Sequence, residues 1–334
     1  MRVFLTGGTG LIGRRIVQRL VDRGDEPIIL SRRSDEVRRH RSMRYVRVPQ
    51  GDPTVRGDWE ELVDGADAVI NLAGENLFSH RWDEATKVKI RDSRVRATDG
   101  IVRAIASASK KPEVLVQASA IGFYGTHGDD ELTESSPSGW DFLAKVCREW
   151  EDAAAPVADQ GVRLATIRPG IVLAQGAGAL GVMTPIFRWL PGGAAPVGGG
   201  GHGDLKLAKG QQWMSWIHLD DIVGLFLMAV DNREATGPIN GTAPNPVRNA
   251  EFSQALAKAV HRPMLPVGPP DALIRLALGE IADVVTKGQR VLPTKAQALG
   301  YHFAYPDLDS ALANLFAKPE PTPKPAPAPS HSHH

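Results

Sequence analysis

Three glycines near the amino terminus have the spacing of a turn that binds a pyrophosphate. An apolar run of strand length, Val3-Phe4-Leu5, precedes them, and an amphipathic run over residues 14–23 follows them. A strand, a tight glycine turn and a helix in this order direct free backbone N–H groups and the positive end of the helix dipole at an anion. Glycine also lets the turn approach the phosphates and lets the helix pack closely on the strand. The predicted contacts in this turn are Gly7, Gly10, Leu11, Ile12 and Gly13.

A second apolar run, residues 27–30, ends on side chains that suit a phosphorylated ribose. Ser31, Arg32 and Arg33 follow it, and no acid occurs until Asp35. An NAD site usually has Asp or Glu at this strand end to bind the ribose hydroxyls, whereas arginine suits a 2′-phosphate. These residues therefore predict NADP in preference to NAD.

Seven arginines stand between residues 32 and 47. Such a cluster is one signature of nucleic-acid binding, but two acids, Asp35 and Glu36, interrupt it and the net charge of the whole chain is only +1. We interpret the cluster as a solvated basic face beside the NADP phosphate, with no nucleic-acid partner.

Small and polar residues also end the later apolar runs of the chain. In a parallel sheet the carboxyl ends of the strands lie along one edge, and ligands bind in the crevice outside it. The residues expected to line the cofactor there are Asn71, Leu72, Ala73, Gly74, Arg168 and Pro169. Ser119 ends another run, and Tyr124 lies on the next loop, over the expected nicotinamide position. We predict Ser119 and Tyr124 as the catalytic residues, with Tyr124 as proton donor; for Ser119 the alternative is a hydrogen bond to backbone or cofactor alone.

Apolar strands that alternate with helices predict the fold that positions these residues. The expected strands are residues 3–5, 27–30, 43–48, 67–74, 114–120, 164–167 and 212–219. The expected helices are residues 14–23, 59–63, 83–107, 141–157, 183–190, 222–230, 249–260, 270–285 and 308–315. This order indicates an α/β fold with a doubly wound parallel sheet, a Rossmann fold, covered on both faces. In the helix over 83–107 we expect Val88, Val95, Ile101, Val102 and Ile105 to face inward.

Changes in composition along the chain suggest three parts. The Rossmann domain is expected over residues 1–240, with a glycine- and alanine-rich insertion at 176–210. A smaller α+β domain on the substrate side is expected over 247–316. Residues 318–334 alternate proline with small and polar residues, so we expect a disordered tail.

Bulk properties limit the remaining possibilities. The 334 residues include one cysteine, Cys147, which excludes an intramolecular disulfide and a cysteine metal cluster. No uninterrupted apolar run reaches the roughly 18 residues of a membrane span, and the first strand leaves no room for a signal peptide, so we expect a cytoplasmic protein without membrane contact. His218, Asp220 and Asp221 are expected to be a helix start, capped by the two acids, and no metal site is predicted.

The motifs above resemble the extended branch of the short-chain dehydrogenase/reductase superfamily. Its markers are matched in order by Thr6-Gly7-Gly8-Thr9-Gly10-Leu11-Ile12-Gly13, Asn71-Leu72-Ala73-Gly74, Ser119 with Tyr124-Gly125, and Arg168-Pro169-Gly170. An atypical epimerase-like subgroup (SDR39U1-like) is similar also at Arg91-Asp92-Ser93-Arg94 and over 142–151, and residues from about 247 to 315 resemble its C-terminal domain of unknown function (DUF1731). The resemblance implies an NAD(P)-binding oxidoreductase or nucleotide-sugar-epimerase-like enzyme, and implies no particular substrate.

One departure from the superfamily bears directly on its chemistry. The usual catalyst is Tyr-x-x-x-Lys, yet the residues four positions after the four tyrosines are Pro49, Gly128, Tyr305 and Asp309. Glu75, Arg91 and Lys145 are further polar candidates near the site, each with a plain alternative as a salt bridge or a solvated surface residue. Two functions therefore stay open: an NADP(H)-dependent enzyme acting on an unidentified small molecule, or a non-catalytic NADP(H)-binding sensor.

Overall fold

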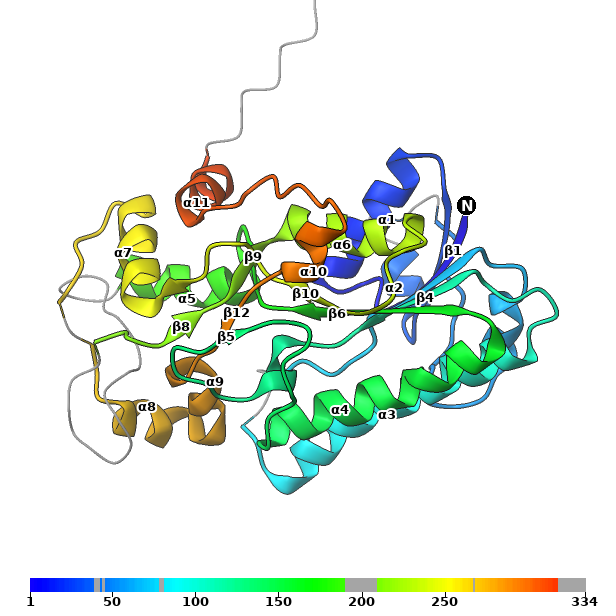
Figure 1. Ribbon diagram of the computed structural model, residues 1–334, viewed down its shortest axis with the longest axis horizontal. Helices are drawn as coiled ribbons and strands as arrows, with labels where there is room; N and C mark the ends of the chain where they lie inside the picture. Colours follow the sequence, from blue (N-terminus) through cyan, green and yellow to red (C-terminus); the bar gives the residue numbers. More distant parts are fainter. Residues whose placement is uncertain (39–42, 44–45, 78–80, 190–208, 267, 318–334) are drawn as a thin grey trace, which may run out of the picture.

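A six-stranded parallel sheet forms the centre of the molecule in the computed structural model, which describes residues 1–317 except 39–42, 44–45, 78–80, 190–208 and 267 (Figure 1). The strand order is β10-β6-β4-β3-β1-β2. The strands are β1 (Arg2–Thr6), β2 (Glu26–Leu30), β3 (Ala68–Asn71), β4 (Val114–Ala118), β6 (Arg163–Pro169) and β10 (Gly237–Gly241). All neighbouring pairs are parallel. The predicted doubly wound α/β fold is confirmed.

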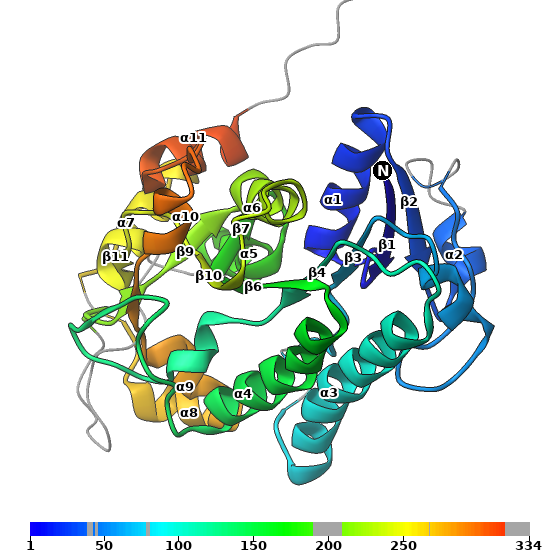
Figure 2. The same ribbon diagram turned by 45° about the vertical axis from the view of Figure 1, so that its right-hand side comes forward.

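Helices cover both faces of this sheet (Figure 2). On one face lie α1 (Leu11–Asp22) and α6 (Leu219–Asp231), and on the other lie α3 (Glu84–Ser107) and α4 (Phe142–Ala154) side by side. The short helices η2 (Asp58–Val63) and η4 (Ala155–Gln160) pack with the α3 and α4 layer, and α2 (Ser34–Arg38) follows β2.

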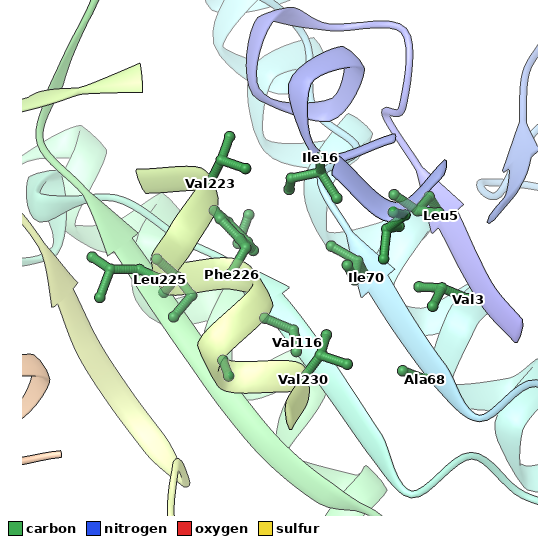
Figure 3. Packing of buried hydrophobic residues seen from close by; sticks show 14 of the residues in the cluster. Val3, Leu5, Ile16, Ala68, Ile70, Val116, Val223, Leu225, Phe226 and Val230 are labelled. Atoms are coloured by element: carbon green, nitrogen blue, oxygen red, sulfur yellow. The ribbon is translucent and has the colours of Figure 1, made fainter. Parts of the chain in front are cut away.

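The alternation of side chains along each strand divides the core between the two faces. In β1, Val3 and Leu5 pack in the cluster of α1 and α6, whereas Phe4 belongs to the cluster on the opposite face. Figure 3 shows the first cluster, with Ile16 of α1 and Phe226 of α6 above the strands. Because both faces are covered, the inner strands β1, β3 and β4 are apolar at most positions.

A separate apolar cluster joins the C-terminal helices to the segment after β6. That segment consists of β7 (Ile171–Ala174), α5 (Gly178–Trp189), β8 (Trp213–Met214) and β9 (Trp216–His218). Trp216 and Leu173 pack there with Phe252 of α7 (Asn249–Ala259) and Leu312 of α11 (Leu308–Phe316). The boundary at residue 240 therefore stays a prediction, because this cluster is built from both sides of it.

The other C-terminal elements are short. They are β11 (Val247–Arg248), α8 (Asp271–Leu278), η5 (Gly279–Ile281), α9 (Ala282–Thr286), β12 (Arg290–Val291) and α10 (Thr294–Ala298). β11 pairs with β8, and β12 pairs with β5 (Glu131–Leu132). The buried Asp221 carboxylate on α6 accepts hydrogen bonds from the backbone N–H groups of Ala304 (2.8 Å) and Tyr305 (3.0 Å), which fixes the approach to α11 against the Rossmann part.

Several predicted elements differ from the structure for physical reasons. The strand over 212–219 is two strands, because the chain passes from β11 to β7 as pairing partner at Ser215. The helix over 270–285 breaks at Gly279, which adopts a left-handed φ of 64°. Val88 is 55% exposed rather than inward-facing, whereas Ile101 and Ile105 are buried.

Two further differences concern the ends of the sheet. Residues 44–45 of the predicted strand 43–48 lie outside the described residues, and Arg47 pairs with Ile28 of β2 only through an isolated bridge. β10 was not predicted, because Gly-Pro-Ile-Asn-Gly lacks a strand pattern; its proline is tolerated at the edge of a sheet. Most of the predicted insertion and the whole predicted tail also lie outside the described residues. Within the described ranges no helix combines the length and the apolarity that crossing a membrane requires.

Candidate functional site

The glycine turn after β1 presents an open helix end. Gly10 is the N-cap of α1, and no side chain caps the helix there. The first backbone N–H groups of α1, from Leu11 and Ile12 onward, are the donors that an anion would satisfy. Gly10 is exposed, and a Cβ added to it would meet only the Gly7 carbonyl oxygen, at 3.4 Å. The turn thus has the open surface that a pyrophosphate requires.

The other two glycines of the turn are required by packing. A Cβ on Gly13 would lie 2.3 Å from the Gly7 carbonyl oxygen, and a Cβ on Gly7 would lie 2.5 Å from the Leu72 carbonyl oxygen. Gly7 also has a φ of 67°, in the left-handed region. These contacts hold the turn tightly between α1 and the end of β3.

The end of β2 carries exposed basic side chains. The Ser31 hydroxyl accepts a hydrogen bond from the Arg33 backbone N–H (3.1 Å), which shapes the turn after the strand. Arg33 forms an ion pair with Glu36 at 3.4 Å, with Arg33 75% exposed. Arg32 is exposed and has no hydrogen bond or ion pair within the described part of the chain. Its guanidinium is therefore available to an anionic ligand.

The chain changes from buried to exposed at the end of β3. The Asn71 amide is fully buried, accepts from the Thr6 hydroxyl (2.5 Å), and donates to Thr98 and Gln117 (both 2.9 Å). Its side chain therefore joins β3 to its neighbours. The chain beyond it becomes progressively more accessible: Leu72 and Ala73 are partly buried, and Gly74 is exposed.

Ser119 lies at the carboxyl end of β4, on one end of a buried ion pair. Its hydroxyl donates to the Glu151 carboxylate at 2.6 Å, and Arg168 donates to both carboxylate oxygens at 2.8 Å. The side chain of Arg168 is 4% exposed and that of Glu151 16%. Burial alone would lower the pKa of Arg168, but its bonds to Glu151 outweigh burial and raise it. Arg168 is therefore charged at neutral pH.

Tyr124 lies at the other end of the same ion pair. Its ring is fully buried, and its hydroxyl donates to the Asn240 side-chain oxygen (2.7 Å) and accepts from Arg168 (2.9 Å). Burial raises the pKa of Tyr124 despite the nearby Arg168. The structure thus brings Ser119, Tyr124 and Arg168 together, with the Tyr124 hydroxyl occupied by protein partners. Pro169 follows Arg168 at the end of β6 and is partly buried.

Sequence reasoning missed Glu151 and Asn240. Glu151 stands on α4, and its spacing along that helix gives no sign that it faces the site. Asn240 lies on the unpredicted strand β10. Lys145 is exposed on α4, and Arg91 forms ion pairs with Asp92 and Glu149. Burial raises the pKa of the Cys147 thiol to about 12, so it is protonated and unreactive at neutral pH.

The cap predicted for α6 is wrong in one respect. The His218 Nδ1, and neither acid, caps the helix by accepting from the Asp220 backbone N–H at 3.0 Å. Asp220 pairs with Arg15 of α1 at 2.8 Å, which explains why that acid is turned away from the helix end. No group of three or more His, Cys, Asp or Glu side chains in the described ranges is arranged to hold a metal ion.

Comparison with models of known protein families identifies the family of this chain. The model of the NAD-dependent epimerase/dehydratase family matches residues 3–240, and that of DUF1731, a domain of unknown function, matches residues 269–315. The chain belongs to the NAD-dependent epimerase/dehydratase family. The resemblance to SDR39U1-like proteins with a C-terminal DUF1731 domain is confirmed.

Three known proteins illustrate the similarity. The chain is 43% identical over 315 residues to the chloroplastic SDR39U1 homolog of Arabidopsis thaliana, covering 93% of this chain and 86% of that protein. It is 38% identical over 320 residues to the epimerase family protein YfhF of Bacillus subtilis (strain 168), covering 95% and 98%. The crystal structure of human SDR39U1 (isoform 2) with NADPH superimposes with a TM-score of 0.80 at 30% identity, covering 95% and 99%.

Proposed function

We propose that the protein is an NADP(H)-dependent oxidoreductase or epimerase acting on a small molecule. One observation supports this most directly: the α1 N-terminus without a side-chain cap, Arg32 and Ser119 follow β1, β2 and β4, whose carboxyl ends lie along one edge of the parallel sheet. The similar human protein was crystallised with NADPH. The cofactor would supply hydride transfer. The turn residues Gly7, Gly10, Leu11, Ile12 and Gly13 would hold its pyrophosphate, Ser31, Arg32 and Arg33 its 2′-phosphate, and Leu72, Ala73 and Gly74 the path toward Ser119.

In this proposal Ser119 passes the proton and Glu151 accepts or returns it. The 2.6 Å hydrogen bond aligns the serine hydroxyl with the carboxylate, and the bidentate Arg168 fixes the carboxylate in place. When a substrate alcohol loses a proton to the Ser119 oxygen, the serine proton moves to Glu151; reduction reverses both transfers. Tyr124 is the second proposed catalytic hydroxyl, and it contacts this pair through Arg168.

A second candidate function is a non-catalytic NADP(H) sensor. The observation that favours it is the Tyr124 hydroxyl, which is fully buried and bonded to Asn240 and Arg168, so that it meets a substrate only after these bonds rearrange. Under this alternative the Ser119–Glu151–Arg168 group is a structural network at the cofactor edge.

Titration of the purified protein with NADPH and NADH tests the shared part of both candidates. A charge-assisted contact of roughly 1.5–3 kcal/mol predicts that NADPH binds about tenfold or more tightly than NADH. Arg32→Ala should remove most of this preference, and Arg33→Ala, which loses an exposed ion pair, should remove less. Equal affinities in the parent protein, or an unchanged preference in Arg32→Ala, would overturn the assignment. Turnover of a panel of carbonyl compounds, followed by NADPH absorbance, then separates enzyme from sensor.

A further inference from the structure

Arg94 is a guanidinium placed at the carboxyl edge of the sheet, and it forms no ion pair within the described ranges although the charge of Glu75 acts on it. It stands on α3, next to the end of β3, and a Cβ added to Gly74 would lie 3.1 Å from its Cζ atom. Its Nη1 donates to the Ile90 carbonyl oxygen (2.9 Å) and its Nη2 to the Glu75 carbonyl oxygen (3.0 Å). No carboxylate lies within ion-pair distance of it in the described ranges, unlike the neighbouring Arg91 and Arg96.

The surroundings of Arg94 only partly compensate for its charge. Its guanidinium lies 5.1 Å from the ring centroid of Trp150, a cation–π contact. Burial lowers the pKa of Arg94, which indicates a charge held where water solvates it poorly. Two carbonyl bonds use two of the five N–H groups of an arginine, and a partly buried cation is better stabilised by an anion than by carbonyls alone.

The order of the strands places Arg94 on the expected path of the dinucleotide. In the sheet, β3 stands between β1, which leads to the glycine turn, and β4, which leads to Ser119. A dinucleotide that extends from the turn to Ser119 therefore crosses the end of β3, where Gly74 is exposed and Arg94 lies against it. In such a position the nicotinamide half of the cofactor, which carries one phosphate, would cross there.

We propose that Arg94 binds the phosphate on the nicotinamide side of the dinucleotide. This inference rests on the proposed NADP(H) function and adds an anchor on the opposite side of the cofactor from Arg32. Arg94 supplies a positive charge there that the α1 N-terminus, with only backbone donors, lacks. The competing explanation is that Arg94 merely ties the loop at Glu75 to α3.

Two ligands separate these explanations. NADPH contains both phosphates of the pyrophosphate, whereas adenosine 2′,5′-bisphosphate contains the 2′-phosphate and the adenine-side phosphate but no nicotinamide half. Arg94→Gln should weaken NADPH binding about ten- to a hundredfold and leave the bisphosphate affinity within twofold of the parent. Arg96→Gln is the matched control, because Arg96 is on the same helix but 66% exposed and paired with Asp92; it should change neither affinity.

The outcomes are distinct. Equal losses for both ligands, with a lower melting temperature, would show the structural role and overturn the proposal, as would an unchanged NADPH affinity. If Arg94→Gln does not fold, Arg94→Lys takes its place, and a selective loss of a few-fold for NADPH supports the proposal while equal effects on both ligands contradict it. Failure of the parent protein to bind NADPH at all would instead remove the proposed function.

Discussion

Ser119 and Tyr124 contact opposite members of one ion pair, Glu151 and Arg168. The contribution of each hydroxyl to catalysis can therefore be measured separately. Ser119 is bonded to the Glu151 carboxylate, whereas Tyr124 is bonded to the Arg168 guanidinium and to Asn240. Arg168 additionally lies 3.5 Å from the Phe123 ring centroid, so its position is fixed from several sides. Removal of one hydroxyl therefore leaves the ion pair in place and tests that hydroxyl alone.

We expect Ser119→Ala to lower kcat by about 10² to 10⁴, the usual range for the loss of general acid–base catalysis, with little change in melting temperature. Tyr124→Phe leaves the Asn240 side-chain oxygen and the Arg168 Nη1 without their buried partner, while Arg168 keeps its bonds to Glu151, so it should lower the free energy of unfolding by about 1–3 kcal/mol. Steady-state kinetics and urea unfolding of both variants measure these effects. A stable Tyr124→Phe variant with turnover reduced like that of Ser119→Ala would make Tyr124 the principal donor, and full activity of both would discard both roles.

The residues of this site were predictable to different degrees. Ser119, Tyr124 and Arg168 end apolar runs or follow them closely, and the edge of a parallel sheet gathers such positions. Glu151 has no such signal, because its partner Ser119 is 32 residues away and an acid in an amphipathic helix usually faces water. Asn71 was predicted as a cofactor contact from its place at a strand end. Its buried hydrogen bonds to Thr6, Thr98 and Gln117 could not be predicted, because these partners come from three other elements.

At the scale of elements, the glycine turn before α1 and the first turn of that helix contain one glycine with space for a methyl group, Gly10, and one without, Gly13. Gly10→Ala adds a methyl group at an exposed site whose φ of −74° any residue adopts. We expect this variant to melt within about 2 °C of the parent, since exposed substitutions of this kind change stability little. It should bind NADPH at least about tenfold more weakly, because the methyl group occupies the phosphate surface.

Gly13→Ala is the contrasting variant. Its methyl group would meet backbone at 2.3 Å from the Gly7 carbonyl oxygen and 2.7 Å from the Gly8 Cα, so α1 must shift. Overpacking of this kind costs about 1–3 kcal/mol, which thermal unfolding without ligand would detect. Wild-type NADPH affinity in Gly10→Ala would show that the pyrophosphate binds elsewhere.

Element types followed from local pattern, and element limits followed from tertiary contacts. The strands β1, β2, β3, β4 and β6 and the long helices of the Rossmann part were predicted from apolar runs and helical spacing, since burial on both faces makes the central strands largely apolar. The division of residues 212–219 at Ser215 depends on distant partners: the Ser215 hydroxyl donates to the Gln289 carbonyl oxygen (2.9 Å) and accepts from the Val291 N–H (2.8 Å). No pattern within the segment encodes those contacts.

At the scale of the whole molecule, the C-terminal part is fastened to the Rossmann part at several points. The apolar cluster around Trp216 and Phe252 is one, and the Asp221 carboxylate is another. A third is Glu134, whose carboxylate oxygen accepts from the backbone N–H groups of Asn240 (2.9 Å) and Lys295 (3.2 Å). The helices α7, α8, α9 and α11 lie at one end of the molecule, away from α1 and α2, whereas α10 packs against β10 nearer the middle (Figure 1).

A series of hydrogen bonds connects Ser119 to Asn240 through Glu151, Arg168 and Tyr124. Such a series could couple ligand binding at one end to the stability of the other end. The Asn240 side chain also donates to the Leu292 carbonyl oxygen at 2.9 Å, so one series of bonds extends from the cofactor edge to the residues after β12. If a ligand at Ser119 stabilises the far end through this series, linkage is reciprocal, and the intact far end strengthens binding of that ligand by the same factor. We therefore expect bound NADPH to slow amide hydrogen exchange at Val291 and Leu292, and Asn240→Ala to abolish that slowing. Exchange unaffected by NADPH at these two amides would show that the two ends of the series respond independently.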